Sequence, residues 1–178
     1  MTKQLGFIID VSRCVMCRTC EITCKSVRNV EPGIRWRKVI DTWTGEFPNV
    51  KRSFFSQSCM HCAKPACLDI CPTGAIYKRP EDGIVMVDRN KCNGCKDCAS
   101  ACPWGVPEFG TDGIMQKCDF CVGTGGQPSC VAPCPAEALS FGSTDEIPPV
   151  AAGKTAEKMT RTTRPSVIVI RNNHQESA

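Results

Sequence analysis

Residues 92–103 have the sequence CNGCKDCASACP, in which four cysteines follow one another at steps of three, three and four residues and a proline comes directly after the last. The chain has 178 residues and 16 cysteines, about 9 % of its length, as in disulfide-rich or metal-binding chains. The remaining cysteines form three similar groups, so the pattern is a fourfold internal repeat. The four groups are Cys14, Cys17, Cys20 and Cys24; Cys59, Cys62, Cys67 and Cys71; Cys92, Cys95, Cys98 and Cys102; and Cys118, Cys121, Cys130 and Cys134.

Structural zinc, a disulfide framework and iron–sulfur clusters are the three alternatives for such a pattern. A zinc site normally takes two well-separated pairs of cysteines, which the closely spaced triplets do not resemble. The first residues, 1–6, show no apolar export signal, and disulfides are rare in chains that stay in a reducing compartment. The spacing C-x2-C-x2-C-x3-C-P is the bacterial ferredoxin signature, in which the fourth cysteine ligates the other cluster of a pair. The sequence therefore favours 4Fe–4S clusters.

The last step within every group is four residues, which is about one helical turn. We expect a short helix at 20–24 and another at 98–102, each carrying the fourth thiol from one cluster to its neighbour. Proline ends a helix, and it directly follows the fourth cysteine in three groups. The residues in this position are Lys25, Pro72, Pro103 and Pro135.

Composition excludes several other classes of protein. Only 11 residues are aromatic (7 Phe, 3 Trp and 1 Tyr), so clusters rather than a large apolar core are expected to hold the chain together. No apolar run approaches the roughly 20 residues that cross a bilayer, so we expect no direct membrane span. The net charge of +4 comes from scattered basic residues, which gives no support to nucleic-acid binding.

Short strands and turns are expected between the cysteine groups. A hairpin should join 75–78 to 84–88 through the turn at 80–83, and a longer one should join 34–42 to 50–57. Residues 142–165 resemble an extended connection, and 167–171 should close a sheet edge. Outer strands are expected at 5–10 and 138–141.

Pairing of the groups follows from their spacing. Groups two and three are separated by 20 residues, which suits a two-cluster ferredoxin unit built around one hairpin, and groups one and four must then pair around it. We therefore predict an α+β fold of two interleaved two-cluster ferredoxin-like units, with short strands, hairpins and short helices around four cubane clusters. The inner unit covers 55–107, the outer unit 1–54 plus 108–145, and 146–178 is an extended C-terminal segment. The predicted ligand sets are Cys14, Cys17, Cys20 and Cys134 for cluster A; Cys59, Cys62, Cys67 and Cys102 for cluster B; Cys92, Cys95, Cys98 and Cys71 for cluster C; and Cys118, Cys121, Cys130 and Cys24 for cluster D.

The chain resembles the iron–sulfur electron-transfer subunits of the dimethyl sulfoxide reductase family of molybdenum or tungsten enzymes. The resemblance covers most of the chain, from residue 6 to residue 170. Its most specific stretches are CMHCAKPAC (59–67), CPTGA (71–75), CPWG (102–105) and KCDFC (117–121). Some relatives replace a cysteine of the third group and carry a three-iron cluster. Here all four cysteines of that group are present, so four 4Fe–4S clusters are expected.

The resemblance implies a subunit without catalysis of its own. Such a subunit relays single electrons to or from a large molybdopterin-containing (Mo or W) catalytic subunit, and a membrane anchor subunit or a soluble electron donor is a further expected partner. It implies a place at the extracytoplasmic face of the cytoplasmic membrane, reached with a partner that carries a twin-arginine signal, and a cytoplasmic complex is the alternative. The functional alternative is a freestanding polyferredoxin that shuttles electrons between soluble oxidoreductases.

Two kinds of residue near the cysteines, a histidine and several lysines, are expected to act on the clusters. His61 lies inside group two, where donation to a ligand is favoured over metal ligation because every cluster already has four thiolates. Each cluster with its four thiolates carries about −2, so basic residues that flank the ligands are expected to compensate this charge and raise local potentials. The alternative is that they are ordinary solvated lysines. These flanking residues are Lys25, Lys64, Lys91, Lys96 and Lys117.

Overall fold

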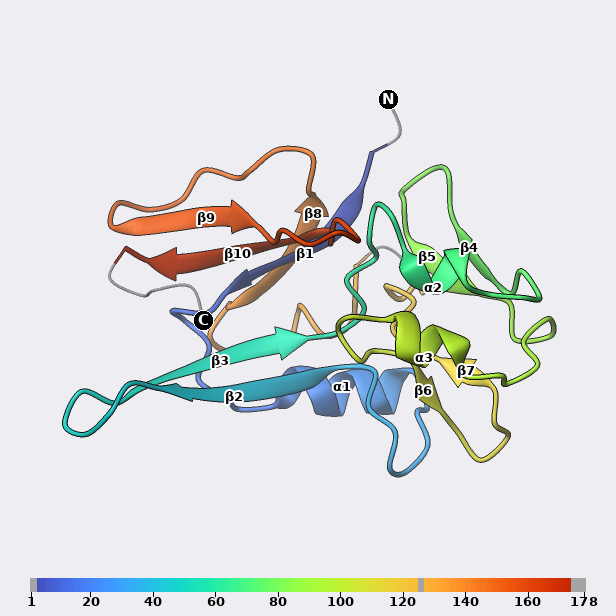
Figure 1. The fold of residues 1–178 in the computed structure, drawn as a ribbon. Coiled ribbons are helices and arrows are strands. Elements are labelled where there is room, and N and C mark those ends of the chain that lie inside the picture. The colour runs from blue at the N-terminus through green and yellow to red at the C-terminus, as the bar shows by residue number, and fades with distance from the viewer. Residues whose placement is uncertain (1–2, 125–126, 174–178) are drawn as a thin grey trace.

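The structure is a computed structural model that describes residues 3–124 and 127–173 (Figure 1). It is an α+β fold made of short strands and a few short helices, as the sequence predicted. No helix in these two ranges combines the length and the apolar character that crossing a membrane requires.

A four-stranded sheet gathers segments from both ends of the chain. Its order is β8 (Leu139–Ser143), β1 (Leu5–Asp10), β10 (Val167–Asn172) and β9 (Lys154–Lys158). β1 runs parallel to β10 and antiparallel to β8, while β9 and β10 are antiparallel. Residues 167, 168 and 169 are at most 1 % exposed, so β10 is covered on both faces and forms part of the core.

The C-terminal part of the sequence differs from expectation in two respects. Residues 154–158, inside the expected connection 142–165, form β9, and β10 lies between β1 and β9 rather than at an edge. β9 is a polar edge strand without an apolar pattern, and its ends are held by Lys154, which pairs with Asp10 at 2.6 Å, and by Lys158, which donates to the carbonyl of Thr144 at 2.8 Å. The last five residues of the segment 146–178 lie outside the described residues.

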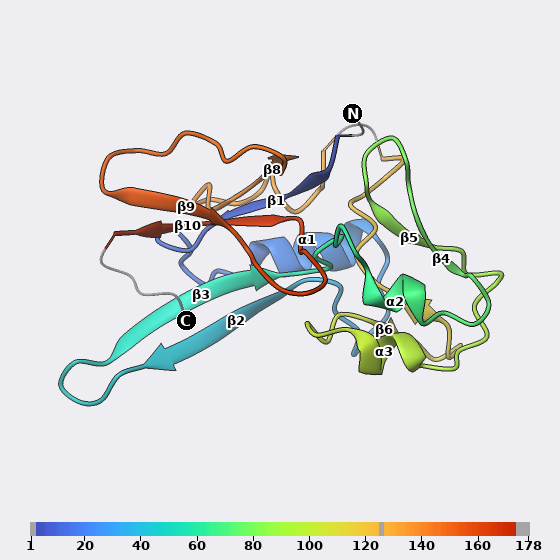
Figure 2. The same ribbon diagram turned by 45° about the horizontal axis from the view of Figure 1, so that its top comes forward.

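Three antiparallel hairpins account for the other strands. β2 (Lys38–Thr44) pairs with β3 (Lys51–Gln57), and this long hairpin extends away from the body in both views (Figures 1 and 2). β4 (Ile76–Lys78) pairs with β5 (Val85–Val87), and β6 (Glu108–Phe109) pairs with β7 (Met115–Gln116). The first two hairpins were predicted from the sequence.

Each described helix carries at least one cysteine. α1 (Thr19–Val27) contains Cys20 and Cys24, α2 (Ala66–Asp69) contains Cys67, and α3 (Asp97–Ala101) contains Cys98. α3 ends directly before the Cys102-Pro103 pair, whereas α1 continues to Val27 because no proline follows its second cysteine. The helices therefore place cysteines of one group about a turn apart.

Candidate metal centres

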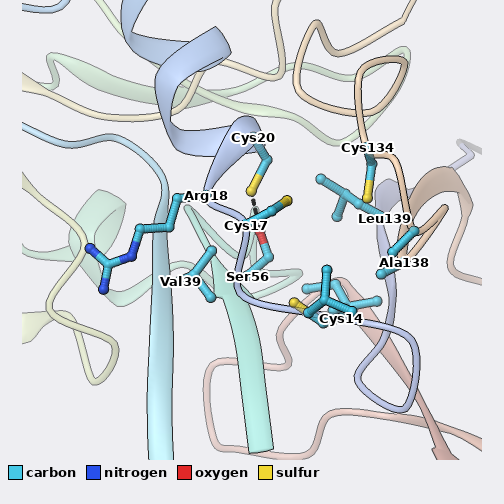
Figure 3. Close-up of a pocket in the computed structure, with 12 residues that line it drawn as sticks. Cys14, Cys17, Arg18, Cys20, Val39, Ser56, Cys134, Ala138 and Leu139 are labelled. Atoms are coloured by element: carbon cyan, nitrogen blue, oxygen red, sulfur yellow. Dashed lines mark hydrogen bonds between the residues drawn. The ribbon is translucent and has the colours of Figure 1, made fainter.

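The first cavity lies beside β1 and β2, and Figure 3 shows its lining. Three cysteines of group one and the last cysteine of group four face it from opposite sides, namely Cys14, Cys17, Cys20 and Cys134. Ile9, Val39 and Leu139 are among the apolar residues that line it, and Arg18 and Ser56 are polar residues of the same wall. Two segments more than 100 residues apart in the sequence thus supply thiols to one cavity, because β8 follows the fourth group and pairs with β1.

A second cavity combines three cysteines of group two with the last cysteine of group three, namely Cys59, Cys62, Cys67 and Cys102. Val85, Trp104 and Lys117 also line it. The indole Nε1 of Trp104 is buried and has no hydrogen-bond acceptor among the described residues. An N–H group of this kind is suited to an anionic group inside the cavity, because burial without an acceptor is costly.

In a third cavity the roles of groups two and three are reversed. It is lined by three cysteines of group three and the last cysteine of group two, namely Cys71, Cys92, Cys95 and Cys98. Ile76, Phe109 and Met115 form its apolar part, while Cys95 is exposed to solvent. Groups two and three therefore contribute to each other's cavities, and α2 and α3, which carry Cys67 and Cys98, pack against one another.

The remaining four cysteines form a fourth set at the buried end of α1. Burial raises the pKa of Cys24 to about 12, and the nearby Cys130 and Cys121 contribute to the rise. Burial also raises the pKa of Cys118 and of Cys130, with Cys24 adding to the first and Cys121 to the second. Cys24, Cys118, Cys121 and Cys130 are thus linked by electrostatic interactions, and Cys118 and Cys130 also interact with Cys59 and Cys20 of the neighbouring sets.

The loop between the first two cysteines turns in the same way in all four groups. The residue directly before the second cysteine has a positive φ in each: 59° at Met16, 40° at His61, 73° at Gly94 and 60° at Phe120. Residues other than glycine rarely adopt this conformation, and such strain is found at ligand-binding sites. The repeated turn curls each loop toward its cavity although the four residues share no side-chain type.

Seven of the sixteen thiols have a raised pKa, so a metal must displace their protons. Burial and nearby cysteines raise the pKa of Cys67 to about 12 and that of Cys98 to about 11. Hydroxyl groups near other sulfur atoms act in the opposite direction: the Thr19 hydroxyl lowers the pKa of Cys17, and Thr73 Oγ1 lies 3.6 Å from Cys71 Sγ. Since metals bind thiolates, loading these sites must release protons. Four thiols around one cavity fit the donor set of a 4Fe–4S cluster.

His61 is part of the packed core. Its side chain is fully buried, its Nδ1 accepts the Val85 N–H at 3.1 Å, and its ring contacts Phe120 edge-on with centroids 5.5 Å apart. Burial and the charges of Lys117 and Arg37 hold its pKa well below 6.5, so the ring is neutral with its proton on Nε2.

One of the five flanking lysines is buried. Lys117 is 4 % exposed, and its ammonium donates to the carbonyls of Val85 and Cys118. The others are exposed, apart from the half-buried Lys25, which caps the carbonyls of Glu31 and Ile34. Sequence reasoning missed a second buried cation, Arg37, which is 1 % exposed. Arg37 directly precedes β2 and is two residues before the buried Val39, and this two-residue spacing is the signal that could have found it.

Comparison with known proteins agrees with the cysteine geometry. The family described as "4Fe-4S dicluster domain" matches residues 50–144. The sequence is 44 % identical over 159 residues to one chain of the anaerobic dimethyl sulfoxide reductase of Escherichia coli (strain K12), covering 83 % of this protein and 77 % of that one. It is 38 % identical over 158 residues to the corresponding chain of the Haemophilus influenzae reductase, covering 82 % and 77 %. It is also 37 % identical over 164 residues to a subunit of the sulfite dehydrogenase of Allochromatium vinosum, covering 78 % and 68 %.

The fold and the four cysteine sets thus define an iron–sulfur protein that carries several 4Fe–4S clusters. This protein belongs to the family of iron–sulfur electron-transfer subunits that includes those of dimethyl sulfoxide reductase, which confirms the resemblance seen in its motifs.

Proposed function

We propose that this protein relays single electrons between a large molybdopterin-containing catalytic subunit, with Mo or W, and a second redox partner, and that it does so with four 4Fe–4S clusters. The proposal is supported by three cavities, each lined by three cysteines of one group and the last cysteine of another, and by the electrostatic interactions among the four cysteines that remain. No thiol is left over, and none of the four sets lacks a member.

The ligand assignment follows these sets. Cys14, Cys17, Cys20 and Cys134 hold cluster A; Cys59, Cys62, Cys67 and Cys102 hold cluster B; Cys92, Cys95, Cys98 and Cys71 hold cluster C; and Cys118, Cys121, Cys130 and Cys24 hold cluster D. Support comes from the exchange of the fourth cysteine, which the helices α1 and α3 make possible by carrying two neighbouring thiols to different sets. Exchange of this kind defines an inner two-cluster unit, 55–107, interleaved with an outer one, 1–54 plus 108–145.

Two electrostatic interactions and one helix contact between sets support a row in the order A, D, B, C. Cys20 of set A acts on the charge of Cys130 in set D, and Cys118 of set D interacts with Cys59 of set B. Sets B and C are joined by α2 and α3. When bound, a 4Fe–4S cluster takes up and releases one electron at a time, so such a row can carry electrons from one end of the protein to the other.

The protein's own residues have three tasks in this function. Thiolates fix the irons, and four on each cluster leave no iron position open to substrate. Apolar side chains such as Ile9, Val39 and Met115 keep water from the cavities. Hydroxyl and N–H donors near the sulfur atoms stabilise added negative charge, as Ser56 does beside Cys20 at 3.3 Å.

The partners and location are inferred from the relatives. These are named as one chain of dimethyl sulfoxide reductase and one subunit of sulfite dehydrogenase, which points to a catalytic subunit as partner. We place the complex at the extracytoplasmic face of the cytoplasmic membrane, carried there by a partner with a twin-arginine signal, and a membrane anchor subunit or a soluble donor supplies or accepts the electrons.

Purification from the native cell under anaerobic conditions tests the proposal. The tagged protein should bring down a large subunit that contains molybdopterin, and the complex should be found in the envelope fraction outside the cytoplasm. Recovery of the iron-loaded protein without a bound partner, as a protein that exchanges electrons freely with soluble oxidoreductases, would identify a polyferredoxin instead. Recovery of the complex in the cytoplasm would contradict the location and leave the partner assignment standing.

A further inference from the structure

Arg37, the residue before β2, places a positive charge in the interior. Its side chain is 1 % exposed and is the largest of the fully buried side chains. The neighbouring Arg35 and Lys38 pair with carboxylates, Glu21 and Glu108, whereas no carboxylate in the described part of the sequence pairs with Arg37. A guanidinium group does not lose its proton in proteins, so this charge needs compensation from another source.

The contacts that hold Arg37 are neutral. Nη1 donates to the carbonyl and the hydroxyl of Ser56 at 3.0 and 2.9 Å, and Nη2 donates to the hydroxyl of Ser58 at 3.0 Å. The guanidinium stacks over the ring of Phe7, 4.2 Å from its centroid. These contacts fix the position of the group but carry no negative charge that would offset it.

Cysteines of two different sets would supply the missing charge once they bind metal as thiolates. The sulfur atoms that act on the Arg37 guanidinium belong to Cys130, Cys118 and Cys24, all in the set of cluster D, and to Cys20 in the set of cluster A. The Arg37 cation is therefore within electrostatic range of cysteines of both sets, and Ser56 joins it to Cys20 of set A.

Ser56 links Arg37 to cluster A through hydrogen bonds. Its Oγ accepts from Arg37 Nη1 and lies 3.3 Å from Cys20 Sγ, the contact drawn as a dashed line in Figure 3. A thiolate has no proton to give, so beside a metal-bound Cys20 the hydroxyl is the donor. Donation from Arg37 polarises the Ser56 hydroxyl and strengthens its bond to the sulfur.

We propose that Arg37 is a positioning residue that raises the reduction potentials of clusters A and D together, directly at D and in part through Ser56 at A. The inference rests on the ligand sets of the proposed function. One-electron reduction adds a negative charge to each set, and a fixed cation in a water-poor interior stabilises the reduced form more than the oxidised form.

Potentiometric titration of the purified complex, followed by EPR, tests this. Components of the signal are assigned to A and D beforehand with Cys17→Ser and Cys121→Ser. In Arg37→Gln, the ratio of reduced to oxidised cluster at a fixed potential should fall about tenfold for D, equivalent to about 59 mV for one electron, with a fall in the same direction for A. Ser56→Ala should lower the ratio for A and leave D unchanged. Arg35→Gln, which removes an equal charge from a half-exposed side chain two residues away, should change neither.

Each outcome bears on the inference. Unchanged potentials in an iron-loaded Arg37→Gln complex would overturn it, as would an equal shift in Arg35→Gln. If Arg37→Gln fails to load iron, the Arg37→Lys complex is measured instead. Loading with potentials close to those of the original protein supports a role for the charge. Failure to load shows that the guanidinium is needed for its hydrogen bonds alone, which overturns the inference. If Cys17→Ser and Cys121→Ser disturb the same component, the ligand sets themselves are wrong and the link between two clusters falls with them.

Discussion

Cys98 and Cys102 lie one helical turn apart on and directly after α3, yet they line different cavities. Cys98 faces the cavity of Cys92 and Cys95, whereas Cys102 faces that of Cys59. The turn of helix between them is what allows one stretch of sequence to contribute to two metal centres.

Substitution of one of these thiols should therefore remove one particular cluster. In Cys102→Ala we expect loss or conversion of cluster B, with up to about four of about sixteen irons lost per molecule and the other three clusters kept. Cys98→Ala should affect cluster C instead. Iron analysis with EPR of the purified complex measures both. Selective loss of the cluster built on Cys14 and Cys17 in the Cys102→Ala complex would contradict the ligand sets.

Much of this site could be predicted from the sequence because the spacing of ligands is a local property. Steps of three and four residues determine which thiols a loop and a helical turn can present, so the four ligand sets could be proposed without knowledge of the fold. The turns before the second cysteines could not be predicted in this way. Met16, His61 and Phe120 share no chemical property, and their common positive φ arises from the need to curl around a cavity.

Tertiary contacts explain the other gaps between prediction and structure. β9 has the sequence KTAEK, and its pairing with β10 depends on the edge that β10 offers and on the ion pair between Lys154 and Asp10. Arg37 stands among other basic residues in the sequence, and only the packing of Phe7, Ser56 and the cysteines distinguishes it from Arg35. From the sequence alone, a basic residue such as Arg37 is expected to be exposed to solvent, so its burial was not predicted.

The sheet that supports set A should be sensitive to a single methyl group at Gly6. A Cβ there would lie 1.8 Å from the carbonyl oxygen of Ser166, so the backbone on one side must move. We expect Gly6→Ala to cost about 1–3 kcal/mol. That loss would lower the midpoint of thermal cluster loss, followed by visible absorbance, by roughly 2–4 °C per kcal/mol.

Gly142 is the matched control, because it pairs with Gly6 in the sheet. A Cβ at Gly142 would make only ordinary contact, 3.8 Å from Ile8 Cδ1. Gly142→Ala should therefore leave the midpoint nearly unchanged. An equal fall in both variants would show that close approach to Ser166 is not what constrains residue 6.

Burial should decide which flanking lysine influences a potential. Lys117 is 4 % exposed and lines the cavity of set B, whereas Lys96 is exposed although it adjoins Cys95. We expect Lys117→Met to lower the potential of cluster B, since a buried charge is screened much less than a solvated one. Lys96→Met should produce little change at cluster C. Redox titrations that show equal shifts in the two variants would contradict this dependence on burial.

The number of irons bound by the purified complex tests the central claim most directly. The protein is separated from its catalytic partner under anaerobic conditions, so that the partner's metal is not counted. Iron, zinc and acid-labile sulfide are then measured on the separated protein, and an EPR spectrum is recorded after reduction. The account predicts about sixteen irons per molecule, matched by sulfide, with signals of reduced 4Fe–4S clusters. Stoichiometric zinc, with no EPR signal on reduction, would contradict it.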